Sequence, residues 1–407
     1  MSTPPAPPLA RPRTPGFARA ALGSVALLAG VLALYVAMFH TLAGFTRALD
    51  HGRTLFRDFI SFFYPMGTTV LTTRAPVLGY LYSPFFALVL HPLALLPLET
   101  AIVVWAVVEV LVTALLFALP VPSLFRAKHA VAWYLAYLAV FLTSFPVLHN
   151  FRWGQVSALI TLLTLAAVYA YRAGRARQAG LLLAVAASVK LYPALLLLTF
   201  VARRERRALL VVFVVVALLM GILPALVLGP EETVRFYVVV YRMVSGSVWI
   251  GHDTNSQYVG SVVARLTSIP ATRAVGGWAG AVIVLADGWA VWRLARTASA
   301  DDAVMWGAAL VFLSLPFALE TSWPHYFVYL PFVQLLVART VAVLPGANLA
   351  RVGVALSIGL ASVFGFALFP GWEAYSRAGC LFFADAVLLV VTWAHLWPRI
   401  ALRPSTA

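Results

Sequence analysis

The side chains able to perform chemistry are few, because only 11% of the 407 residues are charged. They gather in short segments that together mix carboxylates, histidines, cations, amides and aromatic rings: residues 57–65, 80–84, 149–155, 189–193, 252–257 and 320–326. Such groups suit a site for a polar sugar or a phosphate under an amphipathic lid. Lys190 stands out, since it is one of two lysines and lies in an apolar stretch, where a cation is costly and is by default a functional candidate.

The elements that position these segments are membrane helices. The chain is 62% hydrophobic with a mean hydropathy of +0.93, whereas soluble domains are about half apolar and about a quarter charged. This composition excludes a cytosolic enzyme, a nucleic-acid-binding module and a disordered protein. The single cysteine, Cys380, excludes an internal disulfide framework and a cysteine-based metal cluster. The sequence therefore predicts an all-α polytopic membrane protein.

Ten apolar segments are long enough to span a bilayer, which takes about 20 residues: 20–42, 98–119, 130–147, 155–172, 207–229, 275–296, 303–319, 326–344, 352–370 and 379–397. Residues 178–202 have basic loops at both ends but are too short for two crossings of a ~30 Å core. They predict a bent hairpin with its tip at 189–193. Residues 84–97 are interrupted by prolines and predict a short or re-entrant helix. The total is roughly 10 to 13 spanning or re-entrant helices.

Basic residues orient these spans. With the N-terminus inside, 18 of the 29 Lys and Arg residues fall on short inner loops and 10 on longer outer ones, with Lys190 at the hairpin tip. The net charge of +15 thus indicates orientation in the inner cell membrane, with both termini cytoplasmic. The segments rich in polar side chains all fall outside. Nucleotide donors are cytoplasmic and no Gly-rich phosphate loop occurs, so a nucleotide-dependent reaction is disfavoured.

The predicted organisation is a single integral-membrane domain. Residues 1–18 form a disordered cytoplasmic tail, 19–400 the domain and 401–407 a second cytoplasmic tail. The first apolar segment is retained, because it is too long for a signal-peptide core. The domain contains two long outer segments, about 43–83 and about 230–274.

The order and spacing of the outer motifs resemble glycosyltransferase family 87 of the GT-C superfamily, over about residues 50–335. The motifs are Asp58-Phe59 with Phe63-Tyr64, Tyr80-x-Tyr82-Ser83-Pro84, Gly154-Gln155-Val156-Ser157, Gly180 with Lys190-Leu191-Tyr192-Pro193, Asn255-Ser256, and Ser322-Trp323-Pro324-His325-Tyr326. The resemblance implies a GT-C fold with an outward-facing cavity. It also implies a polyprenyl-phosphate sugar as donor, and Asp58 as the catalytic base.

The resemblance leads to an expected reaction. A hexose, mannose above all, passes from polyprenyl phosphate to an outward-facing lipid or glycan acceptor by an inverting displacement, with Asp58 as general base. Asp253 is the second candidate for the base, and Asp58 could instead pair with Arg57 or Arg53.

Cations are needed at the departing phosphate, and Lys190, Arg152 and His325 are the candidates. Lys190 could instead reach the membrane interface or pair with a buried acid, Arg152 could be an interfacial anchor, and His325 a plain interfacial histidine. Sugar and acceptor are expected to contact the following residues: Tyr64, Tyr82, Gln155, Asn255, Trp323 and Tyr192. Asn and Gln side chains also form hydrogen bonds between membrane helices, and tryptophans also anchor helices at the membrane interface. Structural roles therefore remain open alternatives for Gln155, Asn255 and Trp323.

No cofactor or metal is expected, because Asp58 has no second carboxylate nearby, although His149, His252 and His325 could in principle meet. Glu109, Asp287 and Asp385 lie inside predicted spans and favour structural roles. An alternative function is a transporter or lipid flippase in which Lys190 and these three carboxylates form an ion path. Membrane lipids are expected partners, and nucleic acid is not.

Overall fold

The computed structural model describes residues 15–39, 55–125, 129–245 and 253–401. Several predicted features lie outside these ranges: most of the N-terminal tail, the C-terminal tail beyond residue 401, residues 43–54 of the first outer segment, Arg53, Lys128 and His252. The division into one domain with two tails stays a prediction.

The described chain is helical, with no strand among its elements. This confirms the predicted all-α class of membrane protein. In chain order the helices are α1 (Pro15–Phe39), η1 (Phe59–Phe63), α3 (Tyr64–Thr73), α4 (Pro84–Ala94), α5 (Leu98–Ala118), α6 (Val121–Leu124), α7 (Ala130–Leu142), α8 (Phe145–Trp153), α9 (Ser157–Arg172), α10 (Ala176–Val189), η2 (Tyr192–Leu196), α11 (Leu197–Ala202), α12 (Arg206–Val216), η3 (Ala217–Ile222), α13 (Leu223–Leu228), α14 (Pro230–Ser245), α16 (Val259–Thr267), α17 (Thr272–Thr297), α18 (Ala300–Leu313), α19 (Leu315–Ala318), η4 (Pro324–Tyr329), α20 (Leu330–Ala342), α21 (Asn348–Ala361), α22 (Val363–Ala367), α23 (Trp372–Arg377) and α24 (Cys380–Ala401).

Four stretches of the described chain are long and apolar enough to cross a bilayer: 98–124, 206–228, 272–297 and 372–401. Several other expected spans are broken into shorter helices. The span predicted at 130–147 ends at Leu142 and restarts as α8, and 303–319 divides into α18 and α19. Pro146 and Pro316 stand at the starts of the second pieces, because proline fits the first helical turn but not the interior.

The hairpin predicted at 178–202 is present. Helix α10 ends at Val189, the chain turns at Lys190, and η2 and α11 return to Ala202. Helix α10 packs closely on α12, where a Cβ on Gly180 would lie 2.6 Å from the carbonyl oxygen of Ala208. Small residues allow membrane helices to approach in this way. The prolines at 84–97 give one short helix, α4, with Pro92 inside it.

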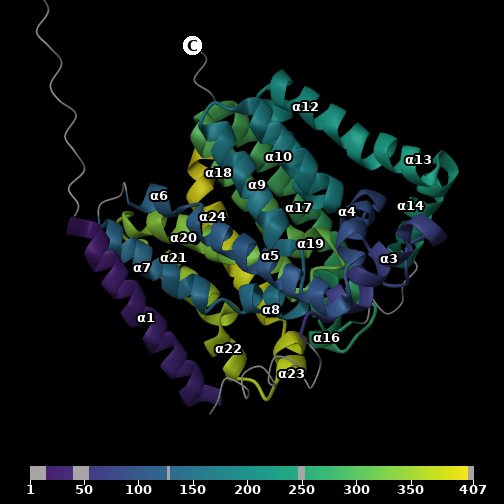
Figure 1. Cartoon of the computed structure of the whole chain (residues 1–407). Coiled ribbons are helices and arrows are strands. Elements are labelled where there is room, and N and C mark those ends of the chain that lie inside the picture. Colours follow the sequence, from purple (N-terminus) through teal and green to yellow (C-terminus); the bar gives the residue numbers. More distant parts are fainter. Residues whose placement is uncertain (1–14, 40–54, 126–128, 246–252, 402–407) are drawn as a thin grey trace, which may run out of the picture.

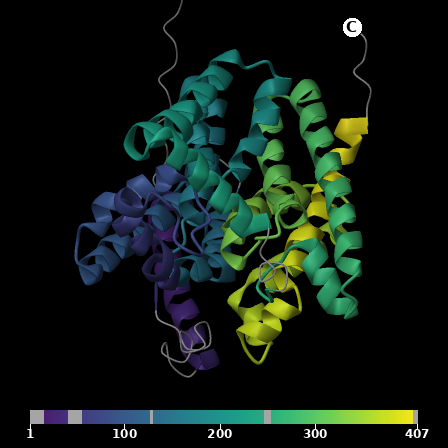
Figure 2. The same cartoon turned by 90° about the vertical axis from the view of Figure 1, so that its right-hand side faces the viewer.

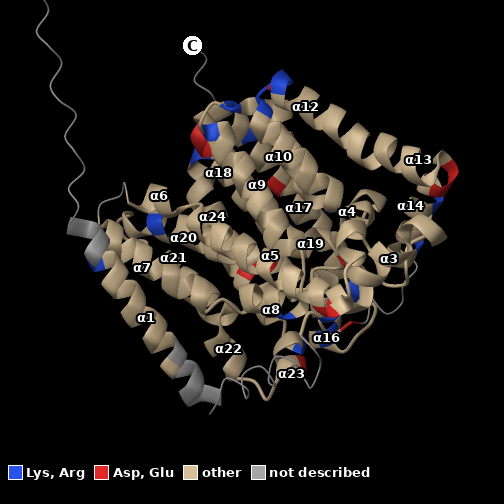
Figure 3. Cartoon of the chain, in the orientation of Figure 1, with Lys and Arg blue, Asp and Glu red and all other residues tan. Residues whose placement is uncertain are grey.

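Several of the turns predicted to face inward meet at one end of the molecule. Arg172, at the end of α9, pairs with Asp301 at 3.4 Å, and Arg203 donates to the carbonyl oxygen of Ala295 at 3.0 Å. The C-terminal helix joins them, since Arg293 donates to the carbonyl oxygen of Ile400 at 3.1 Å. Figure 3 shows much of the blue Lys and Arg colouring around these helix ends.

The main cluster of buried apolar residues extends through both halves of the chain, from Phe56 to Ile400. In Figures 1 and 2 the yellow helix α24 runs through the molecule beside the green α17 and α18, and it packs on α21 as well. Helix α1 lies at the periphery against α7. The short helices α8, α16 and α23 lie together at the lower end in Figure 1, away from the basic turns. Helices α3 and α14, from the two long predicted outer segments, lie at the right-hand side in Figure 1.

Candidate active site

One cavity of about 240 Å³ lies where the predicted outer segments converge. It is lined by side chains from segments that are far apart in the sequence: Arg57, Asp58, Phe62, Phe63, Gly79, Leu81, Tyr82, His149, Trp153, Gln155, Lys190, Asp253, Asn255, Trp323, Pro324, His325 and Tyr326. Seven of the ten predicted site residues are among them: Asp58, Tyr82, Gln155, Lys190, Asn255, Trp323 and His325. The lining combines aromatic rings with polar and charged side chains that can orient a ligand.

Gln155 joins the carboxylate of Asp58 to the wall of the cavity. Its Nε2 donates a hydrogen bond to Asp58 Oδ2, and its Oε1 accepts one from the Tyr82 hydroxyl at 2.7 Å. Asp58 immediately precedes the π-helical turn η1, so its backbone is fixed by that element as well. The carboxylate therefore has a defined orientation at the cavity surface, which a general base needs.

A glycine turn places Gln155. Gly154 ends α8 in the left-handed conformation, with φ +66°. Helix α5 holds this turn, since Trp105 Nε1 donates to the carbonyl oxygen of Gly154 at 3.0 Å. One turn further along α5, Glu109 accepts a hydrogen bond from Asn150 Nδ2 at 2.9 Å. The same Trp105 ring stacks on Phe59 at 5.0 Å, next to Asp58. Helix α5 thus supports both members of the Asp58–Gln155 pair.

Lys190 brings a cation to the same cavity. Its Nζ donates to Ser157 Oγ at 3.0 Å and lies 4.0 Å from the ring centre of Tyr326 and 5.2 Å from that of Tyr82. The side chain is buried, and the carboxylate of Asp58 acts on it electrostatically. An ammonium held by a hydroxyl and two aromatic faces is well placed for an anionic ligand.

Two histidines form another part of the wall. The rings of His149 and His325 lie 6.0 Å apart and nearly parallel. Burial lowers the pKa of His149 to about 3; burial, with smaller contributions from Lys190 and His149, also lowers the pKa of His325 well below its usual value. Both rings are therefore neutral. His149 Nδ1 and His325 Nε2 have no hydrogen-bond partner among the described residues.

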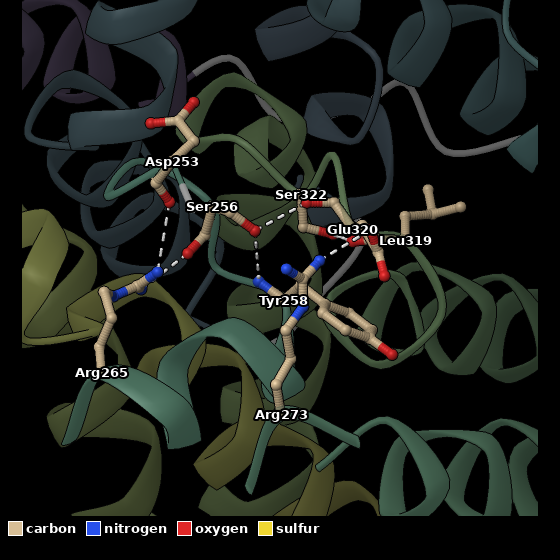
Figure 4. Close-up of polar contacts among 8 residues, drawn as sticks. All are labelled: Asp253, Ser256, Tyr258, Arg265, Arg273, Leu319, Glu320 and Ser322. Atoms are coloured by element: carbon tan, nitrogen blue, oxygen red, sulfur yellow. Dashed lines mark hydrogen bonds and ion pairs between the residues drawn. The ribbon is translucent and has the colours of Figure 1, made fainter. Parts of the chain in front are cut away.

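A further part of the wall is made by Asp253, Asn255 and residues 323–326. Trp323 Nε1 donates to Asp253 Oδ2 at 2.9 Å, and Asp253 Oδ1 accepts from the backbone N–H of Asn255 at 2.8 Å. The two segments are also joined through the backbone, since the N–H of Gln257 donates to the carbonyl oxygen of Ser322 at 2.8 Å. Ser256 Oγ donates to the carbonyl oxygen of Glu320 at 2.7 Å. Of these contacts, Figure 4 shows the one between Ser256 and Glu320.

Arg265, from α16, stabilises the 253–257 segment from behind. Its guanidinium donates to the carbonyl oxygens of Asp253 at 3.3 Å and Ser256 at 2.7 Å. Burial lowers the pKa of Arg265 to about 10, and the charge of Asp253 opposes that shift. The group remains cationic near neutral pH and holds the segment against α16.

Three predicted site residues do not line the cavity. The hydroxyl of Tyr64 donates to the carbonyl oxygen of Leu96 at 2.8 Å. Tyr192 is buried behind Tyr326, with ring centres 5.7 Å apart. Arg152 is buried within α8, and its carbonyl oxygen accepts from the N–H of Phe56. The direction of each side chain depends on how its helix is rotated, which sequence spacing did not reveal.

Sequence reasoning left out several cavity residues, among them Arg57, His149, Trp153 and Tyr326. Each is a sequence neighbour of a predicted residue in the same segment, so proximity to the motifs was the available signal. No three His, Cys, Asp or Glu side chains gather into a metal-binding group in the part of the chain that the structure describes.

The sequence profile of glycosyltransferase family 87 matches residues 80–316, which is more than half of the chain. The chain belongs to glycosyltransferase family 87. This confirms the predicted family and the predicted class of enzyme, a membrane glycosyltransferase. The matched region contains Gln155, Lys190 and Asn255, whereas Asp58 and His325 lie outside it.

Two curated relatives come from Mycobacterium tuberculosis. A polyprenol-phosphate-mannose-dependent alpha-(1-2)-phosphatidylinositol mannoside mannosyltransferase is 29% identical over 298 residues, which are 70% of this chain and 66% of the relative. A polyprenol-phosphate-mannose-dependent alpha-(1-2)-phosphatidylinositol pentamannoside mannosyltransferase is 28% identical over 327 residues, which are 78% and 72% of the two chains. The chain thus spans just under two thirds of the first relative's length. No solved structure matches the chain significantly.

Proposed function

We propose that this family 87 enzyme transfers mannose from polyprenyl-phosphate mannose to a glycolipid acceptor, with inversion at the sugar carbon. The names of the two relatives support the donor and make phosphatidylinositol mannosides the first acceptors to test. The observation that carries the proposal is the cavity, in which the oriented carboxylate of Asp58 and the cation of Lys190 face the same space.

The proposed step is a single displacement. The acceptor hydroxyl attacks the anomeric carbon and gives its proton to Asp58, while the bond from that carbon to the phosphate oxygen breaks. Lys190 stabilises the charge that develops on the departing polyprenyl phosphate, with the polar edge of His325 beside it. A β-linked donor gives an α-linked product. A well-placed base typically accelerates such a step by about 10²–10⁴-fold.

We place the cavity on the outer side of the inner membrane and both termini in the cytoplasm. The support is that several basic turns meet at one end of the molecule, away from the segments that line the cavity (Figures 1 and 3). Short basic loops face the cytoplasm in most membrane proteins. A lipid carrier can deliver an activated sugar to that outer side, where nucleotides are absent.

The transporter alternative receives little support from the buried carboxylates. Glu109 accepts from Asn150, Asp287 from Ser314 and Trp393, and Asp385 from Tyr329. Each is held by neutral donors of its own, rather than being joined to Lys190 in a path. These contacts favour the structural roles that the sequence suggested for the three acids.

The test is transfer of radiolabelled mannose from polyprenyl-phosphate mannose to extracted phosphatidylinositol mannosides by purified protein in detergent. The wild type should form product without any gradient, and a chelator should not change the rate, because the proposed chemistry uses no metal. Asp58→Asn should abolish transfer while the thermal unfolding midpoint stays the same. Glu320→Gln, an outer carboxylate that pairs with Arg273 at 2.9 Å, is the matched control. Near-normal turnover of Asp58→Asn would remove Asp58 from the role of base.

A further inference from the structure

We propose that Asp253 and Asn255, with the indole ring of Trp323, bind the sugar of the acceptor. This rests on the proposed function and deepens it, because it divides the cavity into a phosphate end at Lys190 and an acceptor end at Asp253. It also gives Asp253 a role different from that of a base.

The contacts along one wall set the two ends apart. The ammonium of Lys190 lies over the ring of Tyr326, the rings of Tyr326 and His325 are 5.1 Å apart, and those of His325 and Trp323 are 5.9 Å apart. Trp323 Nε1 then donates to Asp253. Residues 323–326 thus run from the cation to the carboxylate. A phosphate is attracted to the first and repelled by the second, so the Asp253 end suits an uncharged ligand.

The groups at the Asp253 end match the chemistry of a sugar. A sugar presents hydroxyls at its edges and C–H groups on its faces. Asp253 can accept charge-assisted hydrogen bonds from hydroxyls. Asn255 Oδ1 is buried and has no hydrogen-bond partner among the described residues, so a ligand hydroxyl would satisfy it. The indole ring of Trp323, which is bonded to Asp253, lines the cavity and provides an apolar face.

The backbone around Asp253 is fixed before any ligand arrives. Figure 4 shows the carbonyl oxygen of Asp253 turned toward Arg265 and its carboxylate turned the opposite way. Gln257 joins the same segment to helix α23, since its Nε2 donates to the carbonyl oxygen of Ser376 at 3.0 Å. Because these hydrogen bonds already fix the backbone, the carboxylate of Asp253 loses little conformational freedom when a ligand binds. This favours affinity and selectivity for the ligand.

The direction of the displacement places the acceptor at this end. In an inverting reaction the attacking oxygen approaches the anomeric carbon from the face opposite the leaving phosphate. With the phosphate at Lys190, the donor sugar lies next, and the acceptor lies beyond it. Asp58 takes the proton of the attacking hydroxyl, while Asp253 holds another hydroxyl of the acceptor sugar.

The test compares Asp253→Asn with the wild type, using octyl α-mannoside as acceptor and polyprenyl-phosphate mannose as donor. The amide keeps an oxygen for the N–H of Asn255, but it loses the charge and the oxygen that accepts from Trp323 Nε1. The KM for octyl α-mannoside should rise by about tenfold or more, the loss of roughly one charged hydrogen bond. The KM for the donor and kcat at saturating acceptor should stay within about twofold. Glu320→Gln should behave as the wild type.

Binding of octyl α-mannoside to the purified protein without donor gives a readout that does not depend on turnover. It should weaken in Asp253→Asn by a similar factor. Trp323→Phe keeps an aromatic ring but removes the indole N–H that donates to Asp253, so it should also raise the KM for the acceptor. This second variant tests the proposal if Asp253→Asn does not fold.

Three results would overturn the proposal: unchanged acceptor KM and binding, a higher donor KM, or a loss of kcat with the acceptor KM unchanged. The last would make Asp253 the base. Failure of the proposed function would look different, because the wild type itself would then transfer no mannose.

Discussion

The side-chain amide of Gln155 donates a hydrogen bond to the carboxylate of Asp58, although 97 positions separate the two residues in the sequence. The same amide accepts a hydrogen bond from the hydroxyl of Tyr82. Because Nε2 donates and Oε1 accepts, the two bonds together fix the orientation of the amide. A carboxylate of the cavity is therefore positioned by a neutral amide.

Gln155→Leu should lower kcat for mannose transfer by about 100-fold, because a misplaced base loses much of its effect. The KM values for donor and acceptor should change little. Steady-state kinetics in detergent measure both, and a thermal unfolding curve checks that the fold is intact. A variant with unchanged kcat would show that Asp58 does not depend on this amide.

Lys190→Met should reduce kcat/KM for the donor by about 10²–10³-fold, since one cation at a developing phosphate charge is removed. Stability should change little, because methionine fills a similar volume between the rings of Tyr82 and Tyr326 without burying a charge. Arg273→Gln, which removes a cation outside the cavity, is the control. Equal effects of the two substitutions would argue against a phosphate site at Lys190.

Gly154→Ala should destabilise the protein more than Gly174→Ala. Both glycines have positive φ, +66° and +74°, so each substitution carries a backbone cost of about 1–2 kcal/mol. At Gly154 the new Cβ would also lie 3.0 Å from Phe56 and 3.2 Å from Phe59, whereas at Gly174 it meets open space. Thermal unfolding compares the two, and only Gly154→Ala should also slow transfer. Equal losses of stability would mean that the packing around Gly154 adjusts at no cost.

His149→Phe should make stability less sensitive to acid. Helix α8 lies outside the long apolar helices, and burial there lowers the pKa of His149 from 6.5 to about 3. Below pH 6.5 the unfolded chain therefore takes up a proton that the folded chain does not, so stability falls as the pH drops toward 3.

Phenylalanine has no such proton and keeps an aromatic ring beside Trp372 and Trp153. Unfolding midpoints of both proteins, measured from about pH 7.5 to about pH 5, check the difference. Curves that run parallel over that range would show that His149 is protonated in the folded protein.

The features that the sequence predicted correctly depend on local properties of the chain, such as hydropathy, charge and short motifs. The turn at Lys190 follows from basic loops that bound a stretch too short for two crossings. The cavity residues Gln155, Asn255 and Trp323 were found because they belong to polar motifs in an apolar chain. The interruption after Leu142 was missed, since hydropathy continues through Phe145 while Pro146 starts a new helix.

The direction in which each side chain points could not be read from the motifs. Arg152 and Lys190 were both candidates for the phosphate site, but only Lys190 lines the cavity. Tyr64 and Tyr82 both belonged to aromatic pairs, yet Tyr64 bonds to the backbone of Leu96 and Tyr82 to Gln155. Helix rotation and the packing of neighbouring helices decide such cases.

By itself the sequence determined the all-α membrane fold and the family, because hydropathy and the spacing of motifs are local properties of the chain. It also determined which segments carry polar side chains. Only the tertiary structure decided that Asp58 meets Gln155, that Lys190 lies between aromatic rings, and that Asp253 lies at the other end of the 323–326 wall. These contacts join segments from distant parts of the chain, and the way the helices pack sets which of them meet.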